Sequence, residues 1–286
     1  MSERPDRPDR PIRAVLHPTD LTQLSEPAFV HALKIAQAAR SRFYLLNARP
    51  DGSEGVDWTT FPAVRKTLGA WGLLDADTPR EAVAERAGIE VRKVQMRDKD
   101  PVRAILNFLD DHTIDLIVLA THGRDGLPRW LRGSVAEPVA RQAYLPTLFI
   151  PEGARGFVSP DSGEARLAKV LVPVDRRPRP EPAMEECLQL GRALGAADLV
   201  LHAMHVGDPA DAPGPAAETM GRARLERSVR KGDPVEQILA AASELGVDLI
   251  AMATAGREGF LDALRGSTTE RVLRHAPCPV LAVPAA

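Results

Sequence analysis

A glycine–serine pair occurs twice in the chain, each time directly before a helical pattern, at Gly133-Ser134 and at Gly266-Ser267. A glutamate stands three residues after each serine, and S-x-x-E is the spacing of a capping box at a helix N-terminus. Glycine lets backbone N–H groups approach a ligand closely, and the helix dipole favours negative charge at this end. The two pairs therefore predict anion sites, with helix capping alone as the alternative for the serines.

A second glycine, Gly123 in one copy and Gly256 in the other, begins the loop that leads to each pair. Arginines flank the glycines at four positions: Arg124, Arg132, Arg257 and Arg265. Guanidinium groups suit phosphate oxygens, although solvated loop charges are the alternative. Neither G-x-x-x-x-G-K-[ST] nor G-x-G-x-x-G occurs in the chain, so a phosphate site here is of another type.

The loops belong to an internal duplication. Residues 115–151 align with residues 248–284 without a gap at a constant offset of 133. Upstream, AVLHPTD (14–20) matches VLVPVD (170–175) at an offset of 155, so the first half carries 22 extra residues between these two anchors. The duplication predicts two similar domains, one of them with an insertion at about 50–88.

Short apolar runs alternate with longer helical patterns in each half, which is typical of βαβ units on a parallel sheet. Strands are predicted at 14–17, 43–47, 90–95, 116–120 and 147–150, and at 170–174, 199–205, 223–229, 249–253 and 280–283. Helices are predicted at 25–39, 101–112 and 134–143, with counterparts in the second half. The fold class is therefore α/β, with two tandem five-stranded parallel-sheet domains. Ligands of such open sheets bind at the carboxyl ends of the strands, where Gly123 and Gly256 lie.

Prolines bracket the last predicted strand of each half, as is usual at sheet edges. Since an exposed edge needs covering, we expect the last strand of one domain to pair with the last strand of another. The pair forms either between two chains in a homodimer or within one chain as a pseudo-dimer. The expected organisation is a disordered tail (1–11), a first domain (12–151), a linker (152–168) and a second domain (169–286).

The insertion has a helical pattern of its own. Phe61, Val64, Leu68 and Trp71 form one stripe, and a second helix is expected from Pro79 to Ala87, ending at Gly88. A partner surface or lid is one interpretation of this aromatic segment. Local packing onto the first domain is the other.

Composition excludes several classes of protein. A formal charge of −2 gives no general attraction to nucleic acid or an anionic membrane. No apolar run approaches the roughly 20 residues of a membrane span, and MSERPDRPDRP lacks the core of a secretory signal. Cys187 and Cys278 are too few for a disulfide framework or zinc site, and the histidines, His31 among them, show no metal-ligand spacing. We therefore expect a cytoplasmic protein.

The strings THGRDGLPRWLRGSVAE and TAGREGFLDALRGSTTE, with PTD or PVD ending the first strand, resemble the universal stress protein family over nearly the whole chain. The resemblance implies two tandem domains of an adenine-nucleotide α-hydrolase-like, Rossmann-like fold that dimerise through the last strand. Many members bind ATP through a G-x-x-G-(nine residues)-G-[ST] pattern, and others lack it and bind no nucleotide.

Carried onto this chain, the resemblance implies that Asp20 and Asp175 lie near the adenine–ribose end, while the glycine and serine positions wrap the phosphates. Around the first nucleotide it places Pro18, Asp20, Ala48, Leu119, Ala120, His122, Gly123, Arg132, Gly133, Ser134 and Val135. Around the second it places Pro173, Asp175, Val206, Met252, Ala253, Gly256, Arg265, Gly266, Ser267 and Thr268. For the two aspartates, capping the following helix is the alternative.

Both copies depart from the family pattern. Its first glycine is Ala120 in one half and Ala253 in the other, and its histidine, kept at His122, is Ala255 in the second half. The family also has a Gly-Asp-Pro sequence after its third strand. This sequence is kept in the second half, where it begins at Gly232, but its glycine is Lys99 in the first half. An alanine in place of glycine costs about 1 kcal/mol if a positive φ is needed, and little otherwise.

Two functions follow from these observations. The first is a regulatory module of the stress response that binds adenine nucleotide, with ATP (with or without Mg) as the cofactor. The second is a scaffold that binds no nucleotide and acts through protein–protein contacts. An enzyme would be at most a slow ATPase, because hydrolysis needs a metal site and a group to position water, and each half offers only one candidate carboxylate.

Overall fold

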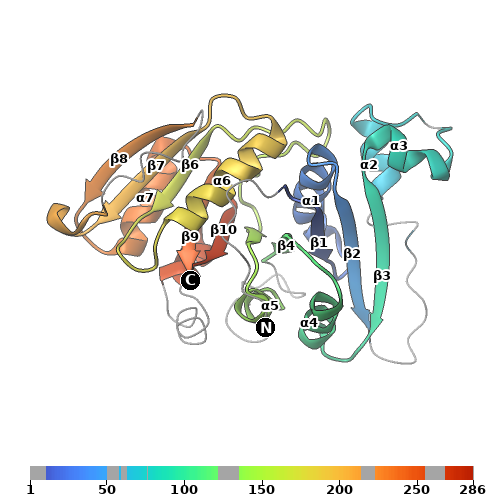
Figure 1. The fold of residues 1–286 in the computed structure, drawn as a ribbon, viewed down its shortest axis with the longest axis horizontal. Helices are drawn as coiled ribbons and strands as arrows, with labels where there is room; N and C mark the ends of the chain where they lie inside the picture. Colours follow the sequence, from blue (N-terminus) through green and yellow to red (C-terminus); the bar gives the residue numbers. More distant parts are fainter. Residues whose placement is uncertain are drawn as a thin grey trace.

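The computed structural model describes residues 11–49, 58, 63–75, 77–121, 135–213, 223–254 and 268–285. Within them, ten strands form one sheet in the order β3-β2-β1-β4-β5-β10-β9-β6-β7-β8 (Figure 1). The strands of the first half are β1 Ala14–Pro18, β2 Arg42–Arg49, β3 Glu90–Arg97, β4 Leu116–Ala120 and β5 Thr147–Ile150. Those of the second half are β6 Lys169–Pro173, β7 Val200–Val206, β8 Arg224–Arg230, β9 Leu249–Thr254 and β10 Val280–Pro284. Each predicted strand overlaps an observed one, and the α/β class is confirmed.

The two halves meet at their last strands. All pairs within a half are parallel, whereas β5 and β10 pair antiparallel, with Val280 opposite Phe149 and Ala282 opposite Thr147. This antiparallel contact joins two parallel five-stranded sheets into one. The last strands thus pair within the chain, which is the intrachain alternative of the sequence analysis.

Helices cover both faces of the sheet. The helix α1 (Glu26–Ala38) and its counterpart α6 (Glu181–Leu194) lie on one face and contact each other, whereas the other face carries α4 (Pro101–Asp111), α5 (Ala136–Ala143), α7 (Pro234–Leu245) and α9 (Thr268–His275). Two apolar clusters result, one beneath each helical layer, and each contains residues of both halves. The core is therefore continuous across the β5–β10 junction.

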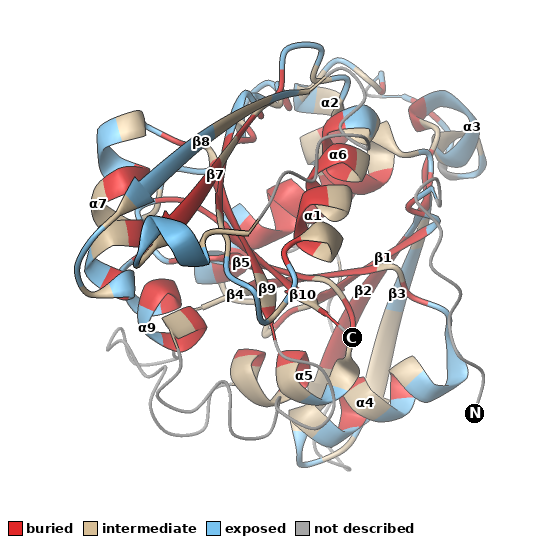
Figure 2. Cartoon of the chain, turned by 60° about the vertical axis from the view of Figure 1, so that its left-hand side comes forward, coloured by how far each residue is buried: buried red, intermediate tan, exposed pale blue. Residues whose placement is uncertain are grey.

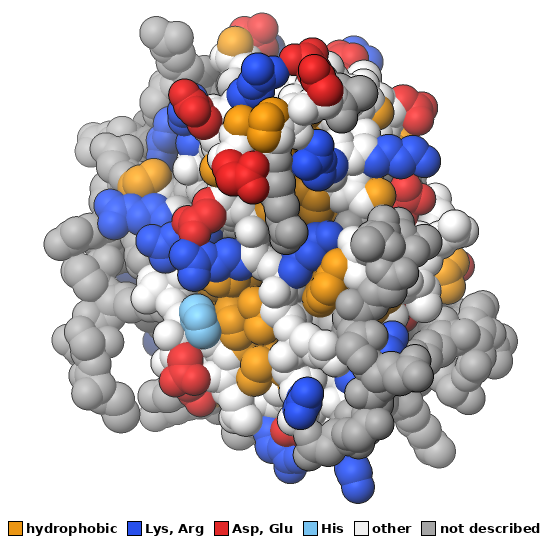
Figure 3. All heavy atoms as spheres, turned by 90° about the vertical axis from the view of Figure 1, so that its right-hand side faces the viewer, with side chains coloured by type: hydrophobic (Ala, Val, Ile, Leu, Met, Phe, Trp, Pro, Cys, Tyr) orange, Lys and Arg blue, Asp and Glu red, His pale blue; other side chains and the backbone are white. Residues whose placement is uncertain are grey.

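The outermost strands are shielded by charge. In Figure 2 the central strands are largely buried, whereas β3 and β8 are mostly exposed or intermediate. Figure 3, which faces the β3 side, shows Lys, Arg, Asp and Glu side chains around small hydrophobic patches. Charged side chains on an edge strand disfavour pairing with another chain. None of the helices in the described ranges is both long and apolar enough to span a bilayer.

The insertion folds into short helices on the α1 side of the sheet. The helix α2 (Val64–Ala70) buries Val64 and Leu68, as the predicted stripe requires, while Phe61 lies outside the described residues. The second predicted helix is a 3₁₀ turn, η2 (Arg80–Ala82), followed by α3 (Val83–Ala87). It ends at Gly88 with φ 68°, the left-handed conformation that a C-terminal glycine supplies.

Trp71 packs the insertion against residues 152–168, the segment expected to link the domains. Its indole Nε1 donates a hydrogen bond to the Pro160 carbonyl (2.9 Å), and Lys34 of α1 lies over its ring. The same segment buries Phe157 and Val158. For the described part of the insertion, the contacts are thus those of the local-packing interpretation.

Candidate functional site

The strand order reverses beside β1 in the first half and beside β6 in the second. The chain runs from β1 outward through β2 and β3, then returns to β4 on the other side of β1, and β6 to β9 repeat this path. Ligands of open α/β sheets bind outside the carboxyl ends of the strands at such a point. Pro18 ends β1 beside the end of β4, and Pro173 ends β6 beside β9.

Asp20 lies in the loop directly after β1, and its carboxylate is held by that loop. Its Oδ1 accepts hydrogen bonds from Thr22 N (3.0 Å) and Thr22 Oγ1 (2.8 Å). Leu21, between them, has a φ of 65°, and its N–H donates to Thr19 Oγ1 (3.0 Å). A left-handed conformation at a residue other than glycine costs about 1–3 kcal/mol and persists where the surroundings enforce it. The aspartate thus closes a turn ahead of α1 through its bonds to Thr22.

Asp175, the counterpart in the second half, has a different environment. It is exposed, and its Oδ1 accepts a hydrogen bond from Arg176 N (2.7 Å). The Arg176 guanidinium in turn pairs with Asp211 (3.0 Å), so this loop is tied to the segment after β7. The two halves therefore keep the aspartate but bond its carboxylate to different groups.

Four apolar residues that the resemblance places around the two nucleotides occupy equivalent places in the two halves. Ala48 and Val206 are half-buried at the carboxyl ends of β2 and β7, while Leu119 and Met252 are buried in β4 and β9. The structure brings them to the same edge of the sheet as Pro18 and Pro173. Leu119 and Met252 also belong to the apolar core, which is their structural role.

Ala120 and Ala253 stand where the family pattern has its first glycine. Both lie in strands, β4 and β9, and the described residues other than glycine with positive φ are Leu21, Arg40 and Tyr144. An alanine in ordinary extended backbone carries no left-handed strain. The penalty considered for these substitutions is therefore not incurred in this structure.

The phosphate-wrapping part of the prediction lies outside the described residues. This applies to His122, Gly123, Arg132, Gly133, Ser134, Gly256, Arg265, Gly266 and Ser267, and also to Arg124, Ala255 and Arg257. The helices that follow are described: Val135 precedes α5, and Thr268 begins α9.

The glutamates of the two S-x-x-E motifs make an additional contact that the sequence analysis missed. Glu137 forms an ion pair with Arg141 (3.8 Å), and Glu270, which is buried, pairs with Arg274. Both pairs have the i,i+4 spacing of neighbours on a helix surface. The serine of each capping box lies outside the described residues.

The aspartate after the third strand caps a helix in both halves. Asp100 accepts hydrogen bonds from the first N–H groups of α4, and Asp233 does the same for α7. A backbone hydrogen bond from Glu236, together with Arg271, lowers the pKa of Asp233. Gly232 has a φ of 131°, which suits glycine, whereas Lys99 at the equivalent position does not have a positive φ. The Gly-to-Lys departure thus accompanies a different backbone conformation.

Two polar residues at the same edge were not predicted. Asn47 and His205 are buried at equivalent positions near the ends of β2 and β7, and each bonds to the carbonyl just ahead of Asp20 or Asp175. The signal was present in the sequence, because each is a polar residue near the end of a largely apolar run, directly before Ala48 or Val206.

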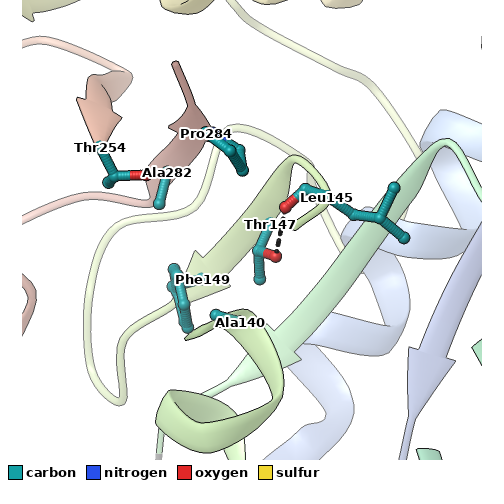
Figure 4. Close-up of a pocket in the computed structure, with 7 residues that line it drawn as sticks. All are labelled: Ala140, Leu145, Thr147, Phe149, Thr254, Ala282 and Pro284. Atoms are coloured by element: carbon teal, nitrogen blue, oxygen red, sulfur yellow. Dashed lines mark hydrogen bonds between the residues drawn. The ribbon is translucent and has the colours of Figure 1, made fainter. Parts of the chain in front are cut away.

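A small hollow at the β5–β10 junction is a separate feature (Figure 4). Its volume is about 10 Å³, which is room for one water molecule and far too little for a nucleotide. Thr147 Oγ1 donates to the Leu145 carbonyl (3.0 Å) at one wall. The lining residues are Ala140, Leu145, Thr147, Phe149, Thr254, Ala282 and Pro284. Across the described ranges, no three His, Cys, Asp or Glu side chains form a group that could hold a metal ion.

Comparison with known proteins gives a consistent result. The model of the universal stress protein family matches residues 11–151 and 216–284. A universal stress protein of Methanocaldococcus jannaschii is 29% identical over 147 residues, covering 48% of this chain and 81% of that protein. One from Mycobacterium tuberculosis is 25% identical over 236 residues, covering 74% and 78%. The crystal structure of a universal stress protein from Archaeoglobus fulgidus matches with a TM-score of 0.65 at 22% identity, covering 96% of each chain, which shows the same fold.

Proposed function

The chain belongs to the universal stress protein family, and on this premise we propose that it is a tandem regulatory module that binds adenine nucleotide, with ATP as its ligand. The observation that carries the proposal is the repeated switch point, where β1 meets β4 and β6 meets β9, with an aspartate after the first strand of each pair. In the proposed arrangement Asp20 and Asp175 lie at the ribose end, and the Gly-Ser pairs hold the phosphates. With nucleotide bound, the protein would be in a second state that a partner can distinguish from the nucleotide-free protein.

The two sites are proposed to differ in affinity. Both loops are tied to neighbouring segments, but the loop after β1 is also cross-linked within itself by the Asp20–Thr22 and Leu21–Thr19 hydrogen bonds, whereas Asp175 is exposed. A loop already held in one conformation loses less entropy when a ligand binds. We therefore assign the tighter site to the first half.

Titration calorimetry with Mg-ATP, carried to millimolar concentration, tests the proposal. We expect two classes of site in the natural protein. Gly133→Val should remove the tighter class and Gly266→Val the weaker one, each with at least a tenfold loss of affinity, because a valine side chain blocks the approach of phosphate to the backbone. Circular dichroism of each variant checks that the fold is kept. Unchanged affinity in the double variant would contradict the proposal, and a natural protein that does not bind would leave the scaffold function.

A further inference from the structure

Asn47 and His205 occupy the same position in the two halves of the sheet. Pro18 of β1 lies opposite Leu46 of β2, and Pro173 of β6 lies opposite Met204 of β7. Asn47 and His205 are the next residues along their strands. Both are buried, with 3% and 4% of their surface exposed, in strands that are otherwise largely apolar at buried positions.

Each side chain donates a hydrogen bond to the same backbone group of its half. Asn47 Nδ2 donates to the Thr19 carbonyl (2.7 Å), and His205 Nδ1 donates to the Val174 carbonyl (3.1 Å). The N–H groups of Thr19 and Val174 in turn donate to the carbonyls of Leu46 and Met204, both at 2.9 Å. The loop residue is thus fixed through both of its backbone polar groups, and the next residue is the aspartate, Asp20 or Asp175.

The energetic argument concerns the polarity of these two positions. Burying a polar side chain is unfavourable unless hydrogen bonds replace its contacts with water. Among the described residues, Asn47 Oδ1 and His205 Nε2 have no hydrogen-bond partner, so the bond to the loop carbonyl is the one that each side chain makes. Two chemically different residues have in common only this donor. Holding the loop therefore accounts for a polar residue at both positions.

The space around each side chain differs in a way that matters for mutation. A Cβ atom at Gly207 would lie 2.8 Å from His205 Nε2, so the imidazole in this position favours a glycine two residues later. The first half has Arg49 at that position. The smaller asparagine should fit in either half, whereas histidine should fit only where a glycine stands two residues later.

We propose that Asn47 and His205 are positioning residues, each of which holds the loop that presents Asp20 or Asp175 at the carboxyl edge of the sheet. The consequence for ligand affinity rests on the proposed function. The consequence for the loop does not, because the hydrogen bonds are present in the protein without ligand.

Amide hydrogen exchange of the full chain without nucleotide provides the first test. Asn47→Leu keeps the size of the side chain and removes the donor, so the amides of residues 20–22 should exchange about fivefold faster, the change expected for one hydrogen bond. His205→Leu should have this effect on residues 175–177 alone. The matched variant His205→Asn retains a donor and should restore slow exchange.

The second test is Mg-ATP titration of the same variants. Asn47→Leu should weaken the first site about fivefold and leave the second unchanged, His205→Leu should do the reverse, and His205→Asn should bind as the natural protein does. If His205→Asn and His205→Leu behave alike, or if faster exchange spreads through the whole half, the positioning role is wrong. If the natural protein binds no nucleotide, the proposed function fails, and the exchange data alone decide the positioning role.

Discussion

Acidification from pH 7 to pH 4 is expected to lower the free energy of unfolding by about 3 kcal/mol through His31 alone. This histidine lies in α1 and is 2% exposed. Its Nδ1 donates to the Pro27 carbonyl (2.6 Å), and its Nε2 accepts a hydrogen bond from Phe157 N (3.0 Å). Both ring nitrogens are thus used by the neutral imidazole. A proton on Nε2 would face the N–H of Phe157, donor against donor.

The sign of the effect follows from the pKa values of the two states. Burial lowers the pKa of His31 from 6.5 to about 4, although the bond to Pro27 opposes this shift. Above pH 6.5 the residue is neutral whether the chain is folded or unfolded. Between pH 6.5 and 4 the unfolded chain binds a proton that the folded protein does not, so stability falls, and below pH 4 the loss levels off.

Urea unfolding followed by circular dichroism at several pH values measures this effect. Since carboxylates also titrate in this range, the difference between the natural protein and His31→Gln is the quantity of interest. Glutamine can accept the hydrogen bond from Phe157 but cannot titrate. The variant should lose about 3 kcal/mol less than the natural protein between pH 7 and 4. Parallel losses in the two proteins would show that His31 is not the group responsible.

The fold could be predicted from the sequence because its signals are local and occur twice. The run Leu116–Ala120 is apolar at every position, which is typical of a strand covered on both faces. Its copy at β9 shares the pattern. Proline brackets around Thr147–Ile150 and its counterpart predicted that the last strands pair, although the choice between one chain and two required the structure.

The candidate site could be predicted only in part, because repetition does not separate a ligand contact from a structural one. Asp115 and Asp248 match in the duplication, yet they lie at the amino edge of the sheet. There each carboxylate accepts backbone N–H bonds at the start of β1 or β6, from Ala14 or Lys169. Conversely, Asn47 and His205 each stand out as a polar residue in a largely apolar run, but two different residue types do not reveal that they donate to the same backbone group.

Individual side-chain contacts between distant segments could not be predicted. His31 gave no signal in the sequence, because its partner Phe157 is 126 residues away. The same holds for Trp71, whose hydrogen bond to Pro160 spans 89 residues. Such contacts depend on how the sheet brings the segments together, and no local pattern encodes them.

The packing of the insertion on residues 152–168 leads to the second large effect, which concerns Gly163. This glycine has a φ of 66°, and a Cβ atom there would lie 2.4 Å from the Trp71 ring. Gly163→Ala thus adds overpacking to left-handed strain, and we expect it to cost about 3 kcal/mol of unfolding free energy. Chemical denaturation at pH 7 measures the loss.

Gly153 is the matched control, because it belongs to the same segment and has a φ of 72°, but a Cβ atom there would meet nothing within 4 Å. Gly153→Ala should therefore cost only the conformational part, about 1 kcal/mol. In a Trp71→Ala background the clash is gone, so the cost of Gly163→Ala should fall to the same value, since neighbouring sites couple in such a cycle. If Gly163→Ala is as mild as Gly153→Ala in the natural background, the insertion does not pack against this segment in solution. A coupling of about 2 kcal/mol would instead establish that the tryptophan ring holds the insertion against the connection between the two halves.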